Sequence, residues 1–271
     1  EVTFKVTNVT GNVHLLQGRG GNIAAINGPE GILIVDDDYR ELSKKLAEAL
    51  KTLGSEKPRF VLNTHWHGDH TQGNEFFGKE SIIIAHTNVR KRMSQDNLNT
   101  FFNRTTPASP AHAWPLMTYT ESMSIHLNGD EIKLIHYPNG HTDGDTVVWF
   151  KKANVVHLGD DFFVGRFPFV DLDSNGNVQG LINNIAAMIA VIPTDAKIIP
   201  GHGPLSTHAD LKAYHSMLVE TSAIVQNAMK AGKTLEEIKA AGFPDKYKEA
   251  GSGFIKTPQW IETIYKSYSK K

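Results

Sequence analysis

One histidine-rich segment constrains this chain more than any other feature of its sequence. The apolar stretch 59–63 is followed at once by Thr64-His65-Trp66-His67-Gly68-Asp69-His70, which brings three imidazoles and one carboxylate into a single short segment. The stretch is typical of a buried strand, and open α/β sheets place ligand sites beyond the carboxyl ends of their strands. In an irregular turn, His65 and His67 can clamp one cation while Asp69 and His70 face a second. The segment therefore predicts a metal site at a strand end.

The amino-acid composition limits which ligands such a site can use. The 271 residues include 13 histidines and no cysteine. Disulfides, thiolate nucleophiles and cysteine ligands are therefore excluded, so any metal must be held by imidazoles and carboxylates. A site made only of nitrogen and oxygen ligands is less selective for zinc than a thiolate site. We expect two Zn²⁺ ions, with iron or manganese as competitors.

Charge and hydropathy restrict the partners. The chain has 28 Lys and Arg against 29 Asp and Glu, and its net charge of −1 disfavours nucleic-acid binding. Its longest apolar runs, 82–85 and 185–192, are shorter than the roughly 20 residues of a membrane span. We expect a small-molecule substrate and no membrane insertion, and we leave the oligomeric state open. Because the chain begins with Glu1, we expect a removed signal peptide and a periplasmic or secreted protein, with a cytoplasmic location as the alternative.

Periodicity predicts many short strands and a few helices. Strands are expected at 4–9, 13–17, 22–27, 32–36, 59–63, 81–85, 124–127, 131–137, 146–150, 155–158 and 197–199, and helices at 39–53, 87–102 and 178–192 and through the C-terminal region. Asn128-Gly129 predicts a hairpin turn, and Thr234 with Glu237 predicts a capping box. This order does not match regular βαβ repeats. It favours an α/β (α+β) domain over 1–271, in which two mixed sheets lie between helical layers and the αβ halves cover roughly 1–110 and 111–271.

Three further candidate ligands lie at the ends of other predicted strands, His141 before 146–150 and Asp160 and His202 after theirs. His141 lies in Gly140-His141-Thr142-Asp143-Gly144-Asp145, Asp160 in Leu158-Gly159-Asp160, and His202 in Gly201-His202-Gly203. Each of these motifs alone is typical of an ordinary turn. Their order after the histidine-rich segment makes a metal site the better interpretation.

This order of residues, H-x-H-x-D-H followed by His141, Asp160 and His202, resembles the metallo-β-lactamase superfamily from Gly11 through His202. The resemblance implies a four-layer αβ/βα sandwich with two metals at one edge. It implies that the first metal is held by His65, His67 and His141, the second by Asp69, His70 and His202, and that Asp160 bridges them. The β-lactamases of this superfamily carry Cys or Ser at the position of Asp160, whereas thioester hydrolases of the glyoxalase II kind and many general hydrolases carry Asp.

The function that follows is hydrolysis. We expect a dinuclear zinc enzyme in which a hydroxide between the metals attacks the carbonyl of a small ester, thioester, lactone or amide. Asp160, as the bridge, and Asp69, as a hydrogen-bonding partner of the hydroxide, are the expected catalytic residues. A β-lactamase of the class B3 kind is the alternative, and a non-catalytic metal-binding protein of the same fold is an alternative of another class. An RNA phosphodiesterase is disfavoured by the balanced charge.

Several other acidic, aromatic and histidine residues are not expected to be metal ligands. The acidic run 36–38 lies where members of the resembled superfamily often have a single Asp near the site, and a solvated turn is the plain alternative. Asp171 with Asp173 is interpreted as a simple turn rather than a calcium loop. Candidate pocket walls, each more often a core residue, are Trp66, Phe101, Phe102, Phe162, Phe163, Phe167 and Phe169. Histidines without partner spacing are interpreted mostly as surface or core residues: His14, His86, His112, His126, His136, His157, His208 and His215.

Overall fold

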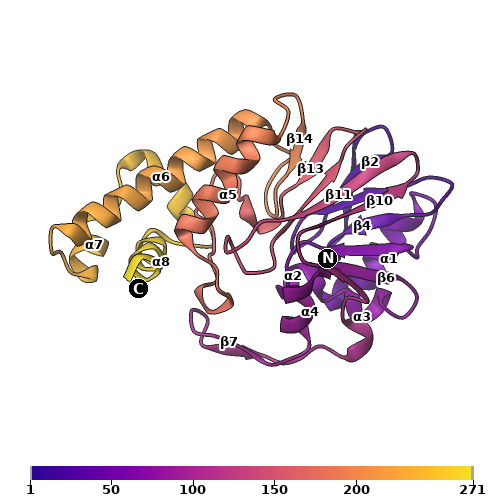
Figure 1. The fold of residues 1–271 in the computed structure, drawn as a ribbon, viewed down its shortest axis with the longest axis horizontal. Helices are drawn as coiled ribbons and strands as arrows, with labels where there is room; N and C mark the ends of the chain where they lie inside the picture. Colours follow the sequence, from indigo (N-terminus) through magenta and orange to yellow (C-terminus); the bar gives the residue numbers. More distant parts are fainter. Residues whose placement is uncertain (1, 270–271) are drawn as a thin grey trace.

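Two β-sheets form the centre of the molecule in the computed structural model, which describes residues 2–269 (Figure 1). The first sheet has the strand order β1-β2-β3-β4-β5-β6-β9. Its strands are β1 (Lys5–Thr10), β2 (Val13–Gln17), β3 (Ile23–Ile26), β4 (Leu33–Val35), β5 (Phe60–Asn63), β6 (Ile82–His86) and β9 (Met117–Tyr119). Pairing is antiparallel from β1 to β4 and parallel from β4 to β9. The predicted strands of this half are thus confirmed to within a few residues.

The second sheet has the strand order β10-β11-β12-β13-β14. Its strands are β10 (Ser122–Leu127), β11 (Asp130–His136), β12 (Thr146–Phe150), β13 (Val155–His157) and β14 (Lys197–Ile199). Asn128 and Gly129 both have positive φ, at 52° and 75°, as a two-residue turn with the right-handed twist of the strands requires. The predicted hairpin is therefore confirmed. Only the pair β13 and β14 is parallel.

The apolar residues divide into layers that establish the architecture. Buried Leu62 and Ile84 of the first sheet share one cluster with Leu134 and Phe150 of the second, so the two sheets face each other. On the outer face of the first sheet lies α1 (Ser43–Lys51), preceded by the turn η1 (Arg40–Leu42). Three helices cover the outer face of the second sheet: α5 (Val178–Val191), α6 (His208–Lys230) and α8 (Thr257–Ser269). The expected four-layer α/β sandwich is confirmed.

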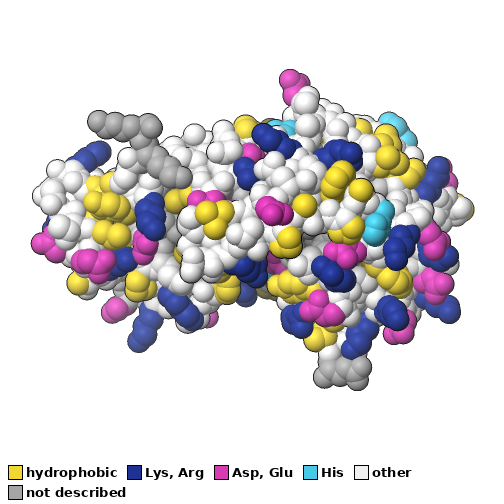
Figure 2. Space-filling model, turned by 90° about the horizontal axis from the view of Figure 1, so that it is seen from below, with side chains coloured by type: hydrophobic (Ala, Val, Ile, Leu, Met, Phe, Trp, Pro, Cys, Tyr) yellow, Lys and Arg dark blue, Asp and Glu magenta, His cyan; other side chains and the backbone are white. Residues whose placement is uncertain are grey.

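The remaining helices are short. They are α2 (Gly68–Thr71), α3 (Asn74–Phe77), α4 (Thr87–Met93), α7 (Leu235–Ala241), η2 (Ala111–Ala113), η3 (Gly159–Asp161), η4 (Leu172–Ser174), η5 (Asp245–Tyr247) and η6 (Ala250–Ser252). The predicted capping box of Thr234 and Glu237 opens α7, which projects with the end of α6 beyond the sheets (Figure 1). None of the helices within residues 2–269 is both long and apolar enough to cross a membrane. The face shown in Figure 2 mixes basic and acidic side chains.

The predicted helix 87–102 is wrong in its second half. Helix α4 ends at Met93, and the chain then forms a small two-stranded sheet of β7 (Asn97–Asn99) and β8 (Arg104–Thr106). The Asn97 side chain donates hydrogen bonds to the carbonyls of Arg92 and Gln95, so it stabilises the chain where the helix ends. Asn103, at φ 47°, makes the turn between the two strands. After this β7–β8 hairpin, β9 pairs with β6, so the first sheet continues beyond residue 110.

Candidate metal centre

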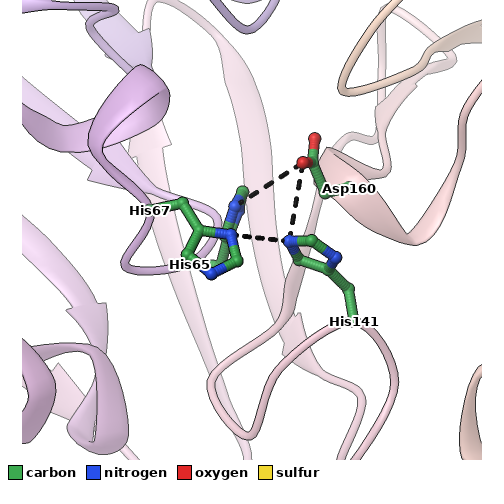
Figure 3. A group of neighbouring side chains, drawn as sticks. All are labelled: His65, His67, His141 and Asp160. Atoms are coloured by element: carbon green, nitrogen blue, oxygen red, sulfur yellow. Dashed lines mark hydrogen bonds and ion pairs between the residues drawn. The ribbon is translucent and has the colours of Figure 1, made fainter. Parts of the chain in front are cut away.

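The structure brings all seven predicted side chains together at one edge of the sandwich. His65 follows β5, His141 follows β11, Asp160 follows β13 and His202 follows β14, each at the carboxyl end of its strand. The chain bends at residues 64–66 and is extended at His67, and the side chains of His65 and His67 point toward the same place (Figure 3). The short helix α2 then turns Asp69 and His70 away from them. These residues form two groups, and within each group the candidate ligand atoms lie within 4.8 Å of one another.

The first group consists of His65, His67, His141 and Asp160, whose side chains point toward one another (Figure 3). The Nε2 atom of His141 lies 2.8 Å from Nδ1 of His67 and 3.5 Å from Oδ2 of Asp160. The Nε2 atom of His65 lies 3.8 Å from the same carboxylate oxygen. Apart from His67, whose side chain is 14% exposed, the group is buried. Four donor atoms of the kinds that zinc prefers therefore converge in one place.

Hydrogen bonds on the outer side of each imidazole determine where its proton lies. His141 Nδ1 donates to the carbonyl of Phe169 at 2.6 Å, and His67 Nε2 donates to Asp171 at 2.9 Å. The Thr64 hydroxyl donates to the carboxylate of Asp36, so it accepts from His65 Nδ1 at 3.0 Å. A neutral imidazole has one N–H and one lone pair. The inward nitrogens of all three histidines therefore carry lone pairs.

This arrangement fits a cation. Two of the inward lone pairs, on His67 and His141, face each other at 2.8 Å with no proton between them in these tautomers. His65 Nε2 is buried and has no hydrogen-bond partner among residues 2–269. Buried polar atoms without partners are costly, and lone pairs at this separation repel each other. A metal ion among these atoms removes both penalties at once.

The second group consists of Asp69, His70 and His202. Nε2 of His202 lies 3.1 Å from Asp69 Oδ2 and 3.3 Å from Nε2 of His70. Asp160 also faces this group, because its Oδ1 lies 3.1 Å from His70 Nε2 and 3.4 Å from His202 Nε2. One carboxylate oxygen thus points to each group, as a bridging ligand requires. Asp161, the neighbour that could be mistaken for the bridge, instead accepts a hydrogen bond from the backbone N–H of His141.

Glycines allow the backbone to pack tightly against these side chains. A Cβ atom on Gly201 would lie 2.0 Å from Oδ1 of Asp160, and one on Gly21 would lie 2.1 Å from the ring of His70. Neither separation is sterically allowed, so both positions require glycine. The second group is therefore enclosed from behind by two backbone segments that are far apart in the sequence.

The two groups differ in their affinity for protons. Burial lowers the pKa of His65 well below its usual range and lowers that of His141 to about 4. Burial opposes charge on His70 and His202 as well, but nearby carboxylates, Asp160 foremost, outweigh it and raise both pKa values, that of His202 to about 9. Burial likewise opposes charge on Asp69, yet His70 and His202 lower its pKa to about 2. In the absence of metal, protons therefore occupy His70 and His202 and not His65 and His141.

Asp36 supports both groups, so of the two interpretations of run 36–38 the position near the site is the right one and the solvated turn is wrong. Asp36, Asp37 and Asp38 are fully buried. Asp36 accepts hydrogen bonds from His70 Nδ1 at 2.7 Å and from both the backbone N–H and the hydroxyl of Thr64. Because such bonds to the outer ring nitrogen orient a metal-binding imidazole, Asp36 holds His70 directly and His65 through Thr64.

Asp171 is the second supporting residue, and the sequence did not identify it. It does form the predicted turn, since it caps η4, but its side chain is buried and accepts a hydrogen bond from His67. Its backbone N–H also donates to the carbonyl of His141. The turn at Asp171 therefore links two residues of the first group.

The predicted aromatic pocket walls divide into core and surface residues. Phe162 and Phe167 are fully buried in the core beneath α5, α6 and α8. Trp66 packs in a small cluster near α4, and Phe163 stacks on the ring of His202. The three other candidates, Phe101, Phe102 and Phe169, contact one another near the first group.

Comparison with known proteins identifies the family. The family model described as the metallo-beta-lactamase superfamily matches residues 16–212, which include all seven candidate ligands. The chain belongs to this superfamily. Together with the curated relatives and solved structures of the same kind, the match supports a metal-dependent hydrolase.

Individual relatives of this superfamily member are distant. A Streptococcus pyogenes serotype M6 protein, named as a probable metallo-hydrolase, is 23% identical over 195 residues, 69% of this chain and 81% of its own length. The type 2 metallo-beta-lactamase of Bacteroides fragilis is 22% identical, over 53% of this chain and only 52% of its own length. Among solved structures, the DIM-1 metallo-beta-lactamase aligns with a TM-score of 0.65 at 20% identity, over 81% of this chain and 99% of its own. The sec-alkylsulfatase Pisa1 from a Pseudomonas species aligns with a TM-score of 0.71 at 14% identity, over 98% of this chain and 50% of its own. At these identities the structural likeness supports the fold alone.

Proposed function

We propose that the chain is a dinuclear hydrolase that cleaves a small ester, thioester, lactone or amide, with two zinc ions as its native metals. The proposal depends mainly on one observation, the convergence of five imidazoles and two carboxylates in two groups that share Asp160. Two divalent cations so held lower the pKa of a shared water from about 15.7 toward about 7 and polarise a carbonyl oxygen.

The seven residues would hold the two cations in different ways. His65, His67 and His141 would hold the first cation through nitrogens that already present lone pairs, and Asp69, His70 and His202 would hold the second. The buried carboxylate of Asp160 would fix the separation of the two cations, since its two oxygens face different groups. No cysteine is needed at any position, in agreement with the composition.

The exposed side of the centre indicates where the substrate approaches. The side chains of His67, Asp69 and His202 are 14%, 23% and 22% exposed, whereas His65, His70 and His141 are buried. Asp69 therefore lies on the open side, and its pKa of about 2 keeps it ionised at neutral pH. There it can accept a hydrogen bond from the attacking water and orient it toward the substrate carbonyl.

A substrate panel with defined metal content tests the proposal. The protein is stripped with a chelator, reloaded with zinc, iron or manganese, analysed for metal, and assayed with p-nitrophenyl acetate, a thioester, a lactone and nitrocefin. We expect about two metal ions per chain, turnover of the ester or thioester that the chelator abolishes, and little turnover of nitrocefin. A His67→Ala variant should lose activity, and His126→Ala, which changes an exposed histidine of β10, should keep it.

Other outcomes would decide against the proposal in specific ways. Nitrocefin turnover above that of every ester would favour the β-lactamase alternative. Stoichiometric metal without turnover of any substrate would favour a binding protein. A protein that takes up no metal would remove the basis of the proposal.

A further inference from the structure

Four phenylalanines form a continuous surface beside the first ligand group, and we call them the aromatic lip: Phe101, Phe102, Phe169 and Phe254. The ring centroid of Phe169 lies 5.2 Å from that of Phe101 and 5.1 Å from that of Phe102. Phe102 in turn lies 5.8 Å from Phe254. The lip thus joins the loop between β7 and β8 to the segment between η6 and α8.

Three of these rings are exposed to solvent. Phe254 is 66% exposed, Phe102 39% and Phe101 36%, whereas Phe169 beneath them is 8% exposed. Figure 2 views the lower side of the molecule, where the β7–β8 hairpin lies, and shows hydrophobic side chains among charged ones. Single exposed apolar residues need no explanation, but rings in mutual contact form a patch of the kind that marks a binding site.

The lip is continuous with the metal centre. The Phe169 ring lies 5.7 Å from the ring of His67 and 5.8 Å from that of His141. Since His67 is the partly exposed member of the first group, the open side of that group borders the lip. A group bound on the exposed rings therefore lies about one ring away from the candidate metal ligands.

Specific hydrogen bonds hold the exposed rings in place. The backbone N–H and the hydroxyl of Thr100 donate to Asp173 Oδ2 at 2.6 and 2.7 Å, which ties the hairpin loop to the turn that carries Asp171. The backbone N–H of Phe102 donates to the side chain of Asn99 at 3.0 Å. The rings are thus presented in a defined arrangement, which lowers the entropic cost of binding.

We propose that the aromatic lip binds the apolar part of the substrate, so that the preferred substrates are esters or thioesters with a medium-length alkyl chain or an aromatic ring. This inference rests on the proposed function, and it names the substrate class of that site. Phe254 lies outside residues 16–212, the segment matched by the superfamily model, so part of the lip comes from the C-terminal region that follows this segment. Burial of alkyl carbons on these rings supplies binding energy that a short acyl group cannot supply.

A chain-length comparison tests the inference. The zinc-loaded protein is assayed with p-nitrophenyl acetate and p-nitrophenyl hexanoate, and the ratio of the two kcat/KM values is measured. We expect this hexanoate-to-acetate ratio to exceed about 10, because four additional methylenes become buried. Phe102→Ala and Phe254→Ala should each lower the ratio about threefold to tenfold. Phe76→Ala is the matched control, since this phenylalanine of α3 is 40% exposed and should leave the wild-type ratio unchanged.

Two results would overturn the inference: a ratio near one in the wild type, or an equal drop in the Phe76→Ala control. A binding measurement separates this failure from a failure of the proposed function. Acetohydroxamate and octanohydroxamate share a metal-chelating head, and their dissociation constants are measured by calorimetry on the zinc-loaded protein. If no ester is turned over, the proposed function fails. The inference about the lip then stands only if octanohydroxamate binds at least about tenfold more tightly and Phe102→Ala removes that advantage.

Discussion

The two ligand groups of the metal centre differ in what the protein has arranged before any cation binds. In the first group, outward hydrogen bonds fix the tautomers of His65, His67 and His141, and their lone pairs already point inward. In the second group, carboxylates raise the pKa values of His70 and His202, so protons occupy the positions that a metal would take. The first group is therefore ready for a cation, whereas the second must exchange protons for one.

This difference suggests that the cations of the two groups have different roles. A group that is largely buried and whose imidazoles are held by several outer hydrogen bonds has the features of a tight, permanent site. A group that includes the partly exposed Asp69 and His202 has the features of a site that remains open to solvent and substrate. The two groups should therefore differ in metal affinity, in its pH dependence and in their effect on activity.

Removal of one histidine from each group should give the largest contrast. We expect His141→Ala to lower turnover at least about 10³-fold, because it removes a ligand from the group that is expected to bind its cation more tightly and to keep it throughout turnover. His202→Ala should retain about one metal ion per chain after gel filtration and lose less activity. Metal analysis and kcat/KM on the best substrate of the panel measure both effects.

The exposed His126 on β10 provides the control for these ligand variants, since His126→Ala should keep two metals and full turnover. Equal loss of metal and activity in His141→Ala and His202→Ala would show that the two groups form a single cooperative unit. Their proposed separate roles would then be wrong.

The pH dependence of metal binding should distinguish the groups next most strongly. Protons leave His202 only near pH 9, so between pH 6 and 8 they compete with the cation at the second group. The weaker dissociation constant should fall about tenfold per pH unit for each proton displaced. The stronger constant should change less, because His141 is already neutral above about pH 4.

Titration with zinc against a chromophoric chelator at several pH values measures both constants. Equal slopes for the two constants would contradict the proposed difference. A steeper slope for the stronger constant would reverse it and assign the tight site to the second group.

The sequence revealed the candidate ligands of both groups, but it left the role of one supporting residue open and missed the other. The seven ligands have recognisable types and spacing, because a metal needs imidazoles and carboxylates at the ends of adjacent strands. Asp36 had only the resemblance to point to it and Asp171 had nothing, since each lies in a stretch that is also typical of a solvent-exposed turn. Only the fold places Asp36 against His70 and Asp171 against His67.

The fold was likewise predicted where local sequence patterns determine it, and not where distant contacts do. Strands such as β2, β12 and β14 were predicted at their observed bounds, because their apolar patterns are local. The region after Met93 was predicted to be helical, yet its structure depends on partners distant in the sequence. One of these is Asp173, which binds the loop between β7 and β8 through Thr100. Tertiary contacts overrode local preference there.

Removal of the His202 imidazole from the metal-free protein should give a smaller, pH-dependent effect on stability. The pKa of His202 is raised to about 9 from a usual value of 6.5, so its stabilising contribution is complete below about pH 6.5 and is lost as the pH rises through 9. The free energy of unfolding of the wild type should therefore exceed that of His202→Gln by up to about 2 kcal/mol at pH 6, with allowance for its partial exposure.

Urea denaturation of the chelator-treated proteins at pH 6, 7.5 and 9 measures this difference, which should approach zero at the highest pH. His126→Gln provides the matched control, and its difference from the wild type should stay constant. A difference for His202→Gln that grows with pH would show that the carboxylates do not hold a proton in the second group.

The smallest expected effect is that of Asp171→Asn on metal binding by the first group. Asp171→Asn keeps an oxygen that can accept the hydrogen bond from His67 but removes the negative charge, so the imidazole stays oriented and becomes a weaker donor to the metal. We expect the stronger dissociation constant to rise about tenfold, while the pH slope of the weaker constant stays unchanged. Asp173→Asn, in the same turn, should alter neither constant, because its carboxylate binds Thr100 instead. If Asp171→Asn weakened both constants equally, the two groups would share their support, and their separate roles would have to come from the protons on His70 and His202 alone.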